Sequence, residues 1–388
     1  MSVDPIVYLH IGAPKTGTTY LQKVLATNRP ALRTQGLLYP GNRADHFLAA
    51  QDVMGHAFRG HQDERAKGTW DRLLREVNAW DQSTLISHEL FCLAQADQIA
   101  RITDSLDGRD IRVILTARDL VRQIPAVWQE DLKNGKVISL PDFSHRVQEN
   151  ASKNQAKGFW GYQDLPRILA RWEARVPSQH IYVVTVPPQG AQPNLLWSRF
   201  TQVLNVDLPQ DRLRVSSTNI SLGAAEAEFL RRLNEQVADT MSWPHYRELV
   251  KNGLVRRALA RGTESRSLDL PPSVAEWAAK RSTQAAVALA GRSYQVVGDL
   301  SDLSPVTSSP PTSAVGPTAE SDIAAVGVAA TADLLVRLRR DRSPTSGSSR
   351  HVPSRRWLAS IPGLRHRRIS GTSRSAQSPD APRDQGAS

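Results

Sequence analysis

Residues 11–22 read Ile11-Gly12-Ala13-Pro14-Lys15-Thr16-Gly17-Thr18-Thr19-Tyr20-Leu21-Gln22 and decide the fold of the first part of the chain. Residues 6–9, just before them, are apolar and mostly β-branched or aromatic, which predicts a buried strand. After them, Leu21, Val24 and Leu25 recur at helical spacing, and Pro30 limits the helix. The sequence therefore predicts a strand, a turn of small residues and a helix.

The turn between this strand and this helix has the composition of an anion-binding loop. Gly12 and Gly17 lack a Cβ atom, so the backbone can turn tightly and an anion can come close. Thr18 and Thr19 open the helix, where free N–H groups and the positive end of the helix dipole favour phosphate. Lys15 adds a full positive charge. A tight turn without a ligand is the simpler interpretation, but a lysine and three threonines have no packing reason to gather there.

The order of residues separates this loop from the one in most nucleoside triphosphatases. In a Walker A loop the lysine follows the second glycine, whereas here Lys15 precedes Gly17 and Thr18 occupies the lysine position. The string Pro-Lys-Thr-Gly-Thr-Thr at residues 14–19 resembles the 5′-phosphosulfate loop of the sulfotransferase family, which uses 3′-phosphoadenosine 5′-phosphosulfate (PAPS). The resemblance implies that PAPS is the co-substrate. The loop residues expected to bind it are Lys15, Thr16, Gly17, Thr18 and Thr19.

Composition and charge place most of the basic character in the C-terminal part. The chain has 388 residues and a formal net charge of +11. From residue 331 onward it has 12 Arg, no Lys and 4 Asp, so the first 330 residues are only weakly basic. Cys92 is the only cysteine, which excludes an intramolecular disulfide and suits a reducing compartment. The N-terminus has no secretory signal pattern, and we expect a cytoplasmic protein.

The rest of the sequence predicts an α/β domain followed by a basic tail. Further strands are predicted at 36–41, 84–89, 111–118 and 181–186, with helical segments at 45–58, 69–80 and 94–106 and through Trp128 and Leu132. This alternation predicts a P-loop-like three-layer domain with a mainly parallel central sheet over residues 1–303. Residues 222–297 are mainly helical and are expected to pack on the same sheet. The remaining segments are a Pro/Ser/Thr-rich linker at 304–321, a short helix at 322–342 and a disordered basic tail at 343–388.

Polar side chains end three of the predicted strands. Lys15 follows the first strand, His88 and Glu89 end the strand at 84–89, and Arg118 ends the strand at 111–118. Ligands of such sheets bind at the carboxyl ends of the strands. We therefore expect these residues to share one cleft.

The resemblance assigns roles to these strand ends. In sulfotransferases an arginine, matched by Arg118, and a serine eight residues later bind the 3′-phosphate of PAPS. Here Ala126 stands at the serine position, so Arg122 or a residue from the late helices is expected to replace that hydroxyl. The segment around Glu89 resembles the one that carries the family's catalytic acid or histidine. Glu89 or His88 would take the proton of the acceptor as the new S–O bond forms, with Glu89 favoured. Lys15 would offset charge on the leaving oxygen, and no metal is required.

Three further polar residues have simpler interpretations. His10 alternates within the first strand and is expected to be packed and hydrogen-bonded. His46 is expected on a surface helix, with an acceptor contact as the less favoured alternative. Ser221 precedes a helix and is expected to cap it, with a cofactor contact as the alternative.

The predicted function is transfer of a sulfuryl group from PAPS to a hydroxyl or amine of a carbohydrate, lipid or small-molecule acceptor. Two alternatives stay open. The first is a P-loop kinase or other phosphotransferase that uses Mg²⁺ and a nucleoside triphosphate. The second is a non-catalytic nucleotide-binding module anchored by its basic tail, for which weak contact with anionic membrane is expected in preference to nucleic acid.

Overall fold

A computed structural model describes residues 5–55, 63–153, 157–215, 221–259, 268–304 and 318–341. By its contacts the chain divides into two units, Met1–Asp341 and Arg342–Ser388. The second unit, with the expected disordered tail, lies outside the described residues, and so does most of the expected linker.

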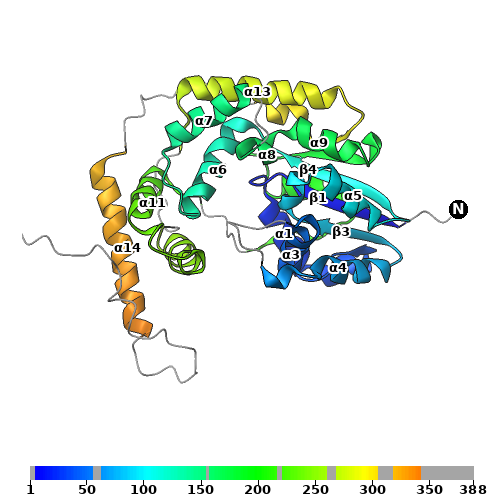
Figure 1. Cartoon of the computed structure of the whole chain (residues 1–388), viewed down its shortest axis with the longest axis horizontal. Helices are drawn as coiled ribbons and strands as arrows, with labels where there is room; N and C mark the ends of the chain where they lie inside the picture. Colours follow the sequence, from blue (N-terminus) through cyan, green and yellow to red (C-terminus); the bar gives the residue numbers. More distant parts are fainter. Residues whose placement is uncertain are drawn as a thin grey trace, which may run out of the picture. The chain divides into compact units, whose positions relative to one another are not determined.

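The centre of the first unit is a six-stranded sheet in which every neighbouring pair of strands is parallel (Figure 1). Its strands are β1 (Ile6–Gly12), β2 (Leu37–Leu38), β3 (Ser83–Ser87), β4 (Asp110–Ala117), β5 (Ile181–Thr185) and β6 (Gln295–Val297), in the order β2-β3-β1-β4-β5-β6. The five predicted strands are confirmed, and with them the α/β class with a parallel sheet. The edge strand β6 was not predicted.

Helices connect the strands and continue after β5. They are α1 (Thr18–Thr27), α2 (Arg29–Thr34), α3 (Arg43–Met54), α4 (Thr69–Asn78), α5 (Ala96–Asp104), α6 (Leu120–Lys133), α7 (Leu140–Ser152), α8 (Phe159–Gln163), α9 (Leu165–Glu173), α10 (Leu195–Leu204), α11 (Ala224–Val237), α12 (Trp243–Tyr246), α13 (Pro272–Ala290) and α14 (Glu320–Asp341). Shorter turns of helix are η1 (Glu64–Ala66), η2 (Glu89–Leu93), η3 (Ser178–His180), η4 (Gln210–Leu213) and η7 (Leu300–Leu303), and η5 (Arg247–Val255) is a π-helix.

Alternate residues of the central strands enter two different hydrophobic clusters. From β1, Val7, Leu9 and Ile11 pack with α3, α4, α5 and α9, whereas Tyr8 packs with α1, α2 and α10 on the opposite face. This two-residue period is what a strand buried on both faces requires. Each fully buried side chain of this size contributes about 1.5–3 kcal/mol. Helices therefore cover both faces of the sheet and fix its carboxyl edge in place.

A third hydrophobic cluster is made mainly by helices. It joins α6, α7, α8, α11, α12, η5 and part of α13, and none of its buried residues belongs to a described strand. Figure 1 shows α11 beside α6 and away from the sheet. The expectation that residues 222–297 pack on the sheet is therefore wrong for α11, because its apolar face is covered by α6. It holds for the end of α13, where Ala286 and Leu289 join the cluster that contains the strands.

The helix expected at 322–342 is α14, which begins two residues earlier than expected. It packs along α11, with Ile323 and Ala330 buried. Arg232 on α11 forms an ion pair with Glu320 at the first turn of α14, with 2.6 Å between nitrogen and oxygen. These contacts make α14 part of the same unit as the sheet.

Candidate functional site

The predicted anion-binding loop joins the carboxyl end of β1 to the first turn of α1. Gly17 precedes the helix with φ +87°, and Lys15 has φ +67°. The Tyr20 amide donates to the Gly17 carbonyl at 2.9 Å as the first bond of the helix. The amides of Thr18 and Thr19 come before it, at the positions where a helix leaves N–H groups without an intrahelical partner. They can therefore donate to an anion at the mouth of the loop.

Glycine is required at position 12, at the base of the loop, because Glu89 lies directly opposite. The φ of Gly12 is +99°, and a Cβ atom there would lie 2.9 Å from Cβ and 3.0 Å from Cα of Glu89. Such contacts are too short for a real side chain, so only glycine lets the end of β1 approach Glu89, the first residue of η2, this closely. The distance between the loop and Glu89 is therefore fixed by the backbone.

Thr16 points into the protein. Its side chain is buried, and its hydroxyl lies 2.5 Å from the Ala13 carbonyl and 2.5 Å from the Thr116 hydroxyl on β4. The structure thus gives this hydroxyl a role in holding the loop against β4. Thr18 and Thr19, in contrast, line a cavity, whereas Thr16 does not.

This cavity, of about 500 Å³, lies at the carboxyl ends of β1 and β3. Loop residues line one part of it, and His88 and Glu89 line another. The structure therefore brings together two of the three strand ends that the sequence singled out. It also adds charged residues from α3, α6, η5 and the residue after η5, namely Arg43, Glu130, Lys133, Lys251 and Arg256.

Glu89 and His88 have different hydrogen-bonding positions in this cavity. An oxygen of Glu89 accepts from the Gln22 side-chain amide at 3.1 Å. Nδ1 of His88 accepts from the Leu90 amide at 3.1 Å, so the lone pair of that nitrogen is already used and a neutral His88 carries its proton on Nε2. That Nε2 lies 4.0 Å from the Glu89 carboxylate. Neutral His88 therefore has no free lone pair to accept a proton, whereas the Glu89 carboxylate has.

The charges of the pair follow from their surroundings. Burial alone would raise the pKa of Glu89, but His88 and the Gln22 amide outweigh it and leave the pKa below its ordinary value. Burial lowers the pKa of His88, against the opposing effect of Glu89. At neutral pH the pair is an ionised carboxylate beside a neutral imidazole.

Glu130 on α6 was not predicted, although it contacts the loop lysine directly. Its two oxygens lie 3.2 Å from Nζ of Lys15 and 2.7 Å from Nζ of Lys251. Burial would raise the pKa of Glu130, but the two lysines lower it to about 2. Lys133 lies one turn further along α6, and burial together with the charge of Lys15 lowers its pKa to about 8. No motif marks these positions, because 115 residues separate Glu130 from Lys15.

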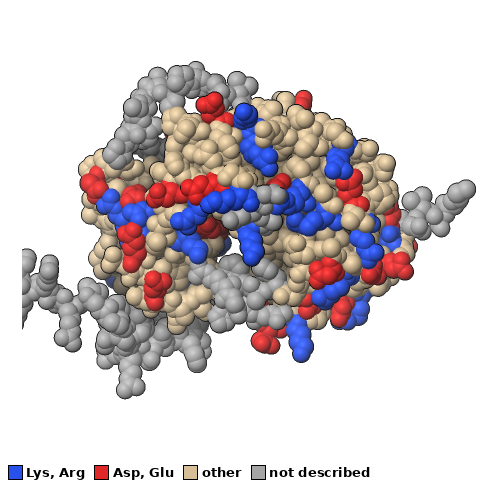
Figure 2. All heavy atoms as spheres, turned by 45° about the horizontal axis from the view of Figure 1, so that its top comes forward, with Lys and Arg blue, Asp and Glu red and all other residues tan. Residues whose placement is uncertain are grey.

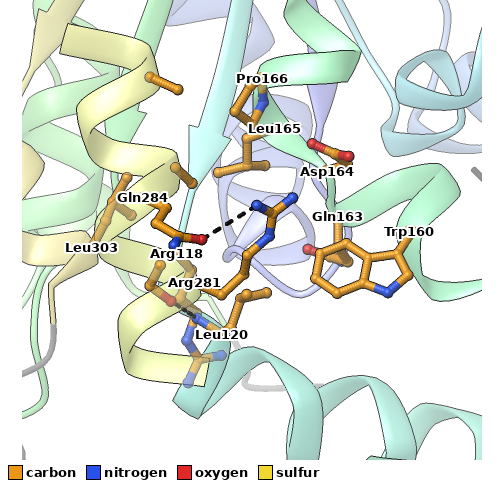
Figure 3. A pocket seen from close by; sticks show the side chains of 13 residues that line it. Arg118, Leu120, Trp160, Gln163, Asp164, Leu165, Pro166, Arg281, Gln284 and Leu303 are labelled. Carbon is orange, nitrogen blue, oxygen red and sulfur yellow. Dashed lines mark hydrogen bonds between the residues drawn. The ribbon is translucent and has the colours of Figure 1, made fainter. Parts of the chain in front are cut away.

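Arg118 lines a second cavity, of about 180 Å³, between the end of β4 and helices α9 and α13 (Figure 3). It still contacts the loop, since one guanidinium nitrogen donates to the Lys15 carbonyl at 3.2 Å. Its Nε is buried without a hydrogen-bond partner. Burial and the neighbouring Arg122 lower its pKa to about 10, so it stays charged at neutral pH. The single cleft expected for all three strand ends is thus two separate cavities, one lined by the loop and one lined by Arg118.

Helix α13 brings a second arginine to the Arg118 cavity. Figure 3 shows the Arg281 side chain reaching into its middle, between Gln284 and Trp160. Ser282 next to it accepts a bond from the Leu120 amide at 2.8 Å and thereby ties α13 to the start of α6. Arg122, by contrast, is bound to Asp119 and to the Pro187 carbonyl.

The three secondary candidates lie outside the larger cavity. His10 is buried, with Nδ1 2.8 Å from the Ser87 hydroxyl, as expected. The expectation that His46 lies on the surface is wrong. Its side chain is fully buried, stacks on Tyr39 and accepts a hydrogen bond from the Ser87 amide at 3.1 Å. Ser221 does not cap α11, because the helix begins at Ala224 and its N-cap is Gly223.

Comparison with models of known protein families, with curated proteins and with solved structures finds no match. Within the described ranges, no three or more His, Cys, Asp or Glu side chains are grouped so that they could hold a metal ion. No helix in the described part of the chain is both long and apolar enough to cross a membrane.

Proposed function

We propose that this chain is a PAPS-dependent sulfotransferase with a P-loop-like nucleotide site. One observation carries the proposal: Lys15 and Glu89, an anion-binding cation and an ionised carboxylate, line the same cavity beside the first turn of α1. Binding of phosphosulfate needs the cation, Lys15, and deprotonation of an acceptor needs the carboxylate, Glu89. The reversed order of Lys15 and Gly17 favours this family over kinases with a Walker A loop.

In the proposed reaction the protein positions two substrates and moves one proton. The amides of Thr18 and Thr19 and the ammonium of Lys15 hold the 5′-phosphosulfate group. PAPS supplies the sulfuryl group and leaves as adenosine 3′,5′-bisphosphate. Glu89 accepts the proton of the acceptor hydroxyl as the oxygen–sulfur bond forms and the bond from sulfur to the phosphate oxygen breaks. Lys15 stabilises the charge that builds on that phosphate oxygen, so placement and electrostatics supply most of the rate.

For the 3′-phosphate we propose the second cavity. Arg118 has a buried Nε without a hydrogen-bond partner, which an anion can satisfy. Arg281 lines the same cavity and can supply the donor that Ala126 lacks. This assignment also fits the contact of Arg118 with the Lys15 carbonyl, which keeps the two phosphate positions next to each other along the loop.

Calorimetry on the full chain tests the nucleotide. We expect adenosine 3′,5′-bisphosphate to bind more tightly than ATP with Mg²⁺, and sulfur-35 PAPS to label an acceptor in a mixture of carbohydrates and lipids. Heat with ATP alone would favour the phosphotransferase. No heat with either nucleotide would contradict both enzymes.

The anchored binding module is tested by truncation. Removing residues 342–388 is the informative deletion, because α14 ends at Asp341 and packs on α11. A sulfotransferase keeps its transfer activity without the tail, whereas an anchored module loses its membrane binding. A deletion from residue 304 would also uncover the helical cluster around Ala330 and give an ambiguous result.

A further inference from the structure

The cavity that contains Glu89 carries more positive charge than the loop supplies. Its basic lining residues are Lys15, Arg43, Lys133, Lys251 and Arg256, and its carboxylates are Glu89 and Glu130. This is an excess of three positive charges when His88 is neutral. Figure 2 shows a band of Lys and Arg side chains across the middle of one face of the molecule, with Asp and Glu side chains beside part of it. Charges of one sign in a cleft attract and concentrate ligands of the opposite sign.

Two of these cations, Arg43 and Arg256, have no carboxylate partner in the described part of the chain. Arg43 is the first residue of α3, and Arg256 follows η5 directly. Neither forms an ion pair with a carboxylate among the residues that the structure describes, and both side chains are exposed. Burial and then the charges of Arg43 and Arg256 lower the pKa of Lys23 on α1, so cations from three separate elements lie close together. Arg43 and Arg256 therefore act on the same part of the cavity.

Arg43 lines this cavity together with His88 and the proposed catalytic base, Glu89. Its charge is one of those that lower the pKa of His88, after the effects of burial and of Glu89. Lys15 lies instead beside α6, where Glu130 contacts it. The cavity thus has one cationic region at the loop, for the donor, and a second near the base, where the acceptor must bind.

We propose that the acceptor is an anionic sugar, which presents a hydroxyl to Glu89 and a carboxylate or sulfate group to Arg43 and Arg256. This proposal rests on the proposed function and adds the chemistry of the acceptor. Arginine suits both anions because its planar guanidinium donates two parallel hydrogen bonds to them.

The lining of the cavity favours a sugar over a lipid chain. Phe47 and Val255 are its large apolar side chains, and charged or polar side chains make up most of the rest. An alkyl chain needs a continuous apolar surface, which this lining does not offer. A sugar ring can pack one face on Phe47 and direct its hydroxyl and acidic groups to the charged wall.

Calorimetry with three glycosides tests the proposal on the full chain, in the presence and absence of adenosine 3′,5′-bisphosphate. The probes are p-nitrophenyl β-glucuronide, p-nitrophenyl β-glucoside 6-sulfate and the neutral p-nitrophenyl β-glucoside. We expect at least one anionic glycoside to bind about tenfold tighter than the neutral one, since a charge-assisted hydrogen bond is worth about that factor. Replacing Arg43→Gln and Arg256→Gln together should reduce this preference about tenfold. The exposed Arg101→Gln on α5, which lies outside the cavity, is the matched control and should keep it.

The outcomes separate the two proposals. Equal binding of the three glycosides, or binding of none, would overturn the anionic acceptor. The proposal would also be overturned if the double arginine variant kept the same preference for an anionic glycoside as the Arg101→Gln control. Absence of bisphosphate binding would contradict the sulfotransferase instead, whatever the glycosides do. A chain that binds the bisphosphate and prefers a charged glycoside supports both.

Discussion

The carboxylate of Glu130 lies 3.2 Å from the ammonium of Lys15, so the lysine of the loop already has an anionic partner on α6. The other oxygen of Glu130 binds Lys251. The ammonium of Lys15 is thus held at the cavity wall before any ligand arrives. The proposed phosphate ligand would have to share or replace this carboxylate.

The first prediction concerns acid stability. Two lysines lower the pKa of Glu130 from 4.5 to about 2, so ionised Glu130 stabilises the folded state above the pKa it has in the unfolded chain. That stabilisation is lost as the pH falls toward the lower, folded pKa. We expect Glu130→Gln to melt at a lower temperature than the wild type at neutral pH, with the difference disappearing between pH 4.5 and about 2. Thermal melts over this range measure it, and a difference that grows toward acid pH would contradict the charge assignment.

The second prediction concerns Lys15. We expect Lys15→Ala to lower the turnover of the proposed sulfuryl transfer by roughly a thousandfold or more, because it removes the cation proposed to lie beside the leaving oxygen. The fold should survive, since alanine adds no strain at the left-handed φ that lysine already tolerates. Steady-state kinetics with PAPS and circular dichroism check the two parts. Exposed Lys136→Ala is the control, and near-normal turnover of Lys15→Ala would refute the role.

The third prediction compares the two candidates for the base. Glu89→Gln should lower kcat by a factor of about 10² to 10⁴, the usual contribution of a general base. His88→Gln should cost less than about tenfold, because the lone pair of Nδ1 is occupied by the Leu90 amide. Since the pKa of Glu89 lies below 4.5, the acid limb of the wild-type rate profile should fall below that pH. Both variants should bind adenosine 3′,5′-bisphosphate like the wild type. A larger loss in His88→Gln would reverse the assignment.

The fourth prediction concerns the close approach at Gly12. Gly12→Ala should lower the free energy of unfolding by about 2–3 kcal/mol, because it adds both strain at positive φ and a clash with Glu89. Gly108→Ala is a matched control, since that glycine also has positive φ but open space where the Cβ would lie. It should cost only about 1 kcal/mol. Urea denaturation of both variants measures the difference, and equal costs would mean that the backbone at Glu89 moves away freely.

The parts of the fold that were predicted from sequence have strong local signals. The strands β1 and β4 are long apolar runs, and β5 is a shorter apolar, β-branched run that Pro187 and Pro188 end, so their pattern is unambiguous. Strand β6 has three residues, Gln295–Val297, and its side chains are largely exposed, so it shows no alternation. Buried His46 was misplaced because α3 is covered on more than one side, which gives its sequence no clear polar face.

The site was predicted where residues are close in sequence or follow a strand, and missed where only packing brings them together. Lys15 and Glu89 follow neighbouring strands, so their shared cavity could be anticipated. Glu130 reads as one more charged residue on an amphipathic helix. Arg118 follows the neighbouring strand on the other side of β1, but α9 and α13 enclose it in a cavity of its own. The separation of Arg118 from the loop cavity depends on helices that are distant in sequence, so it has no local sequence signal.

Helix α13 has one end in each of two cores. Val274 and Ala278 belong to the helical cluster, whereas Ala286 and Leu289 belong to the cluster with the strands. Unfolding of α13 would therefore expose buried residues of both clusters. Heating should therefore melt sheet and helical layer together, in one cooperative transition with a single enthalpy.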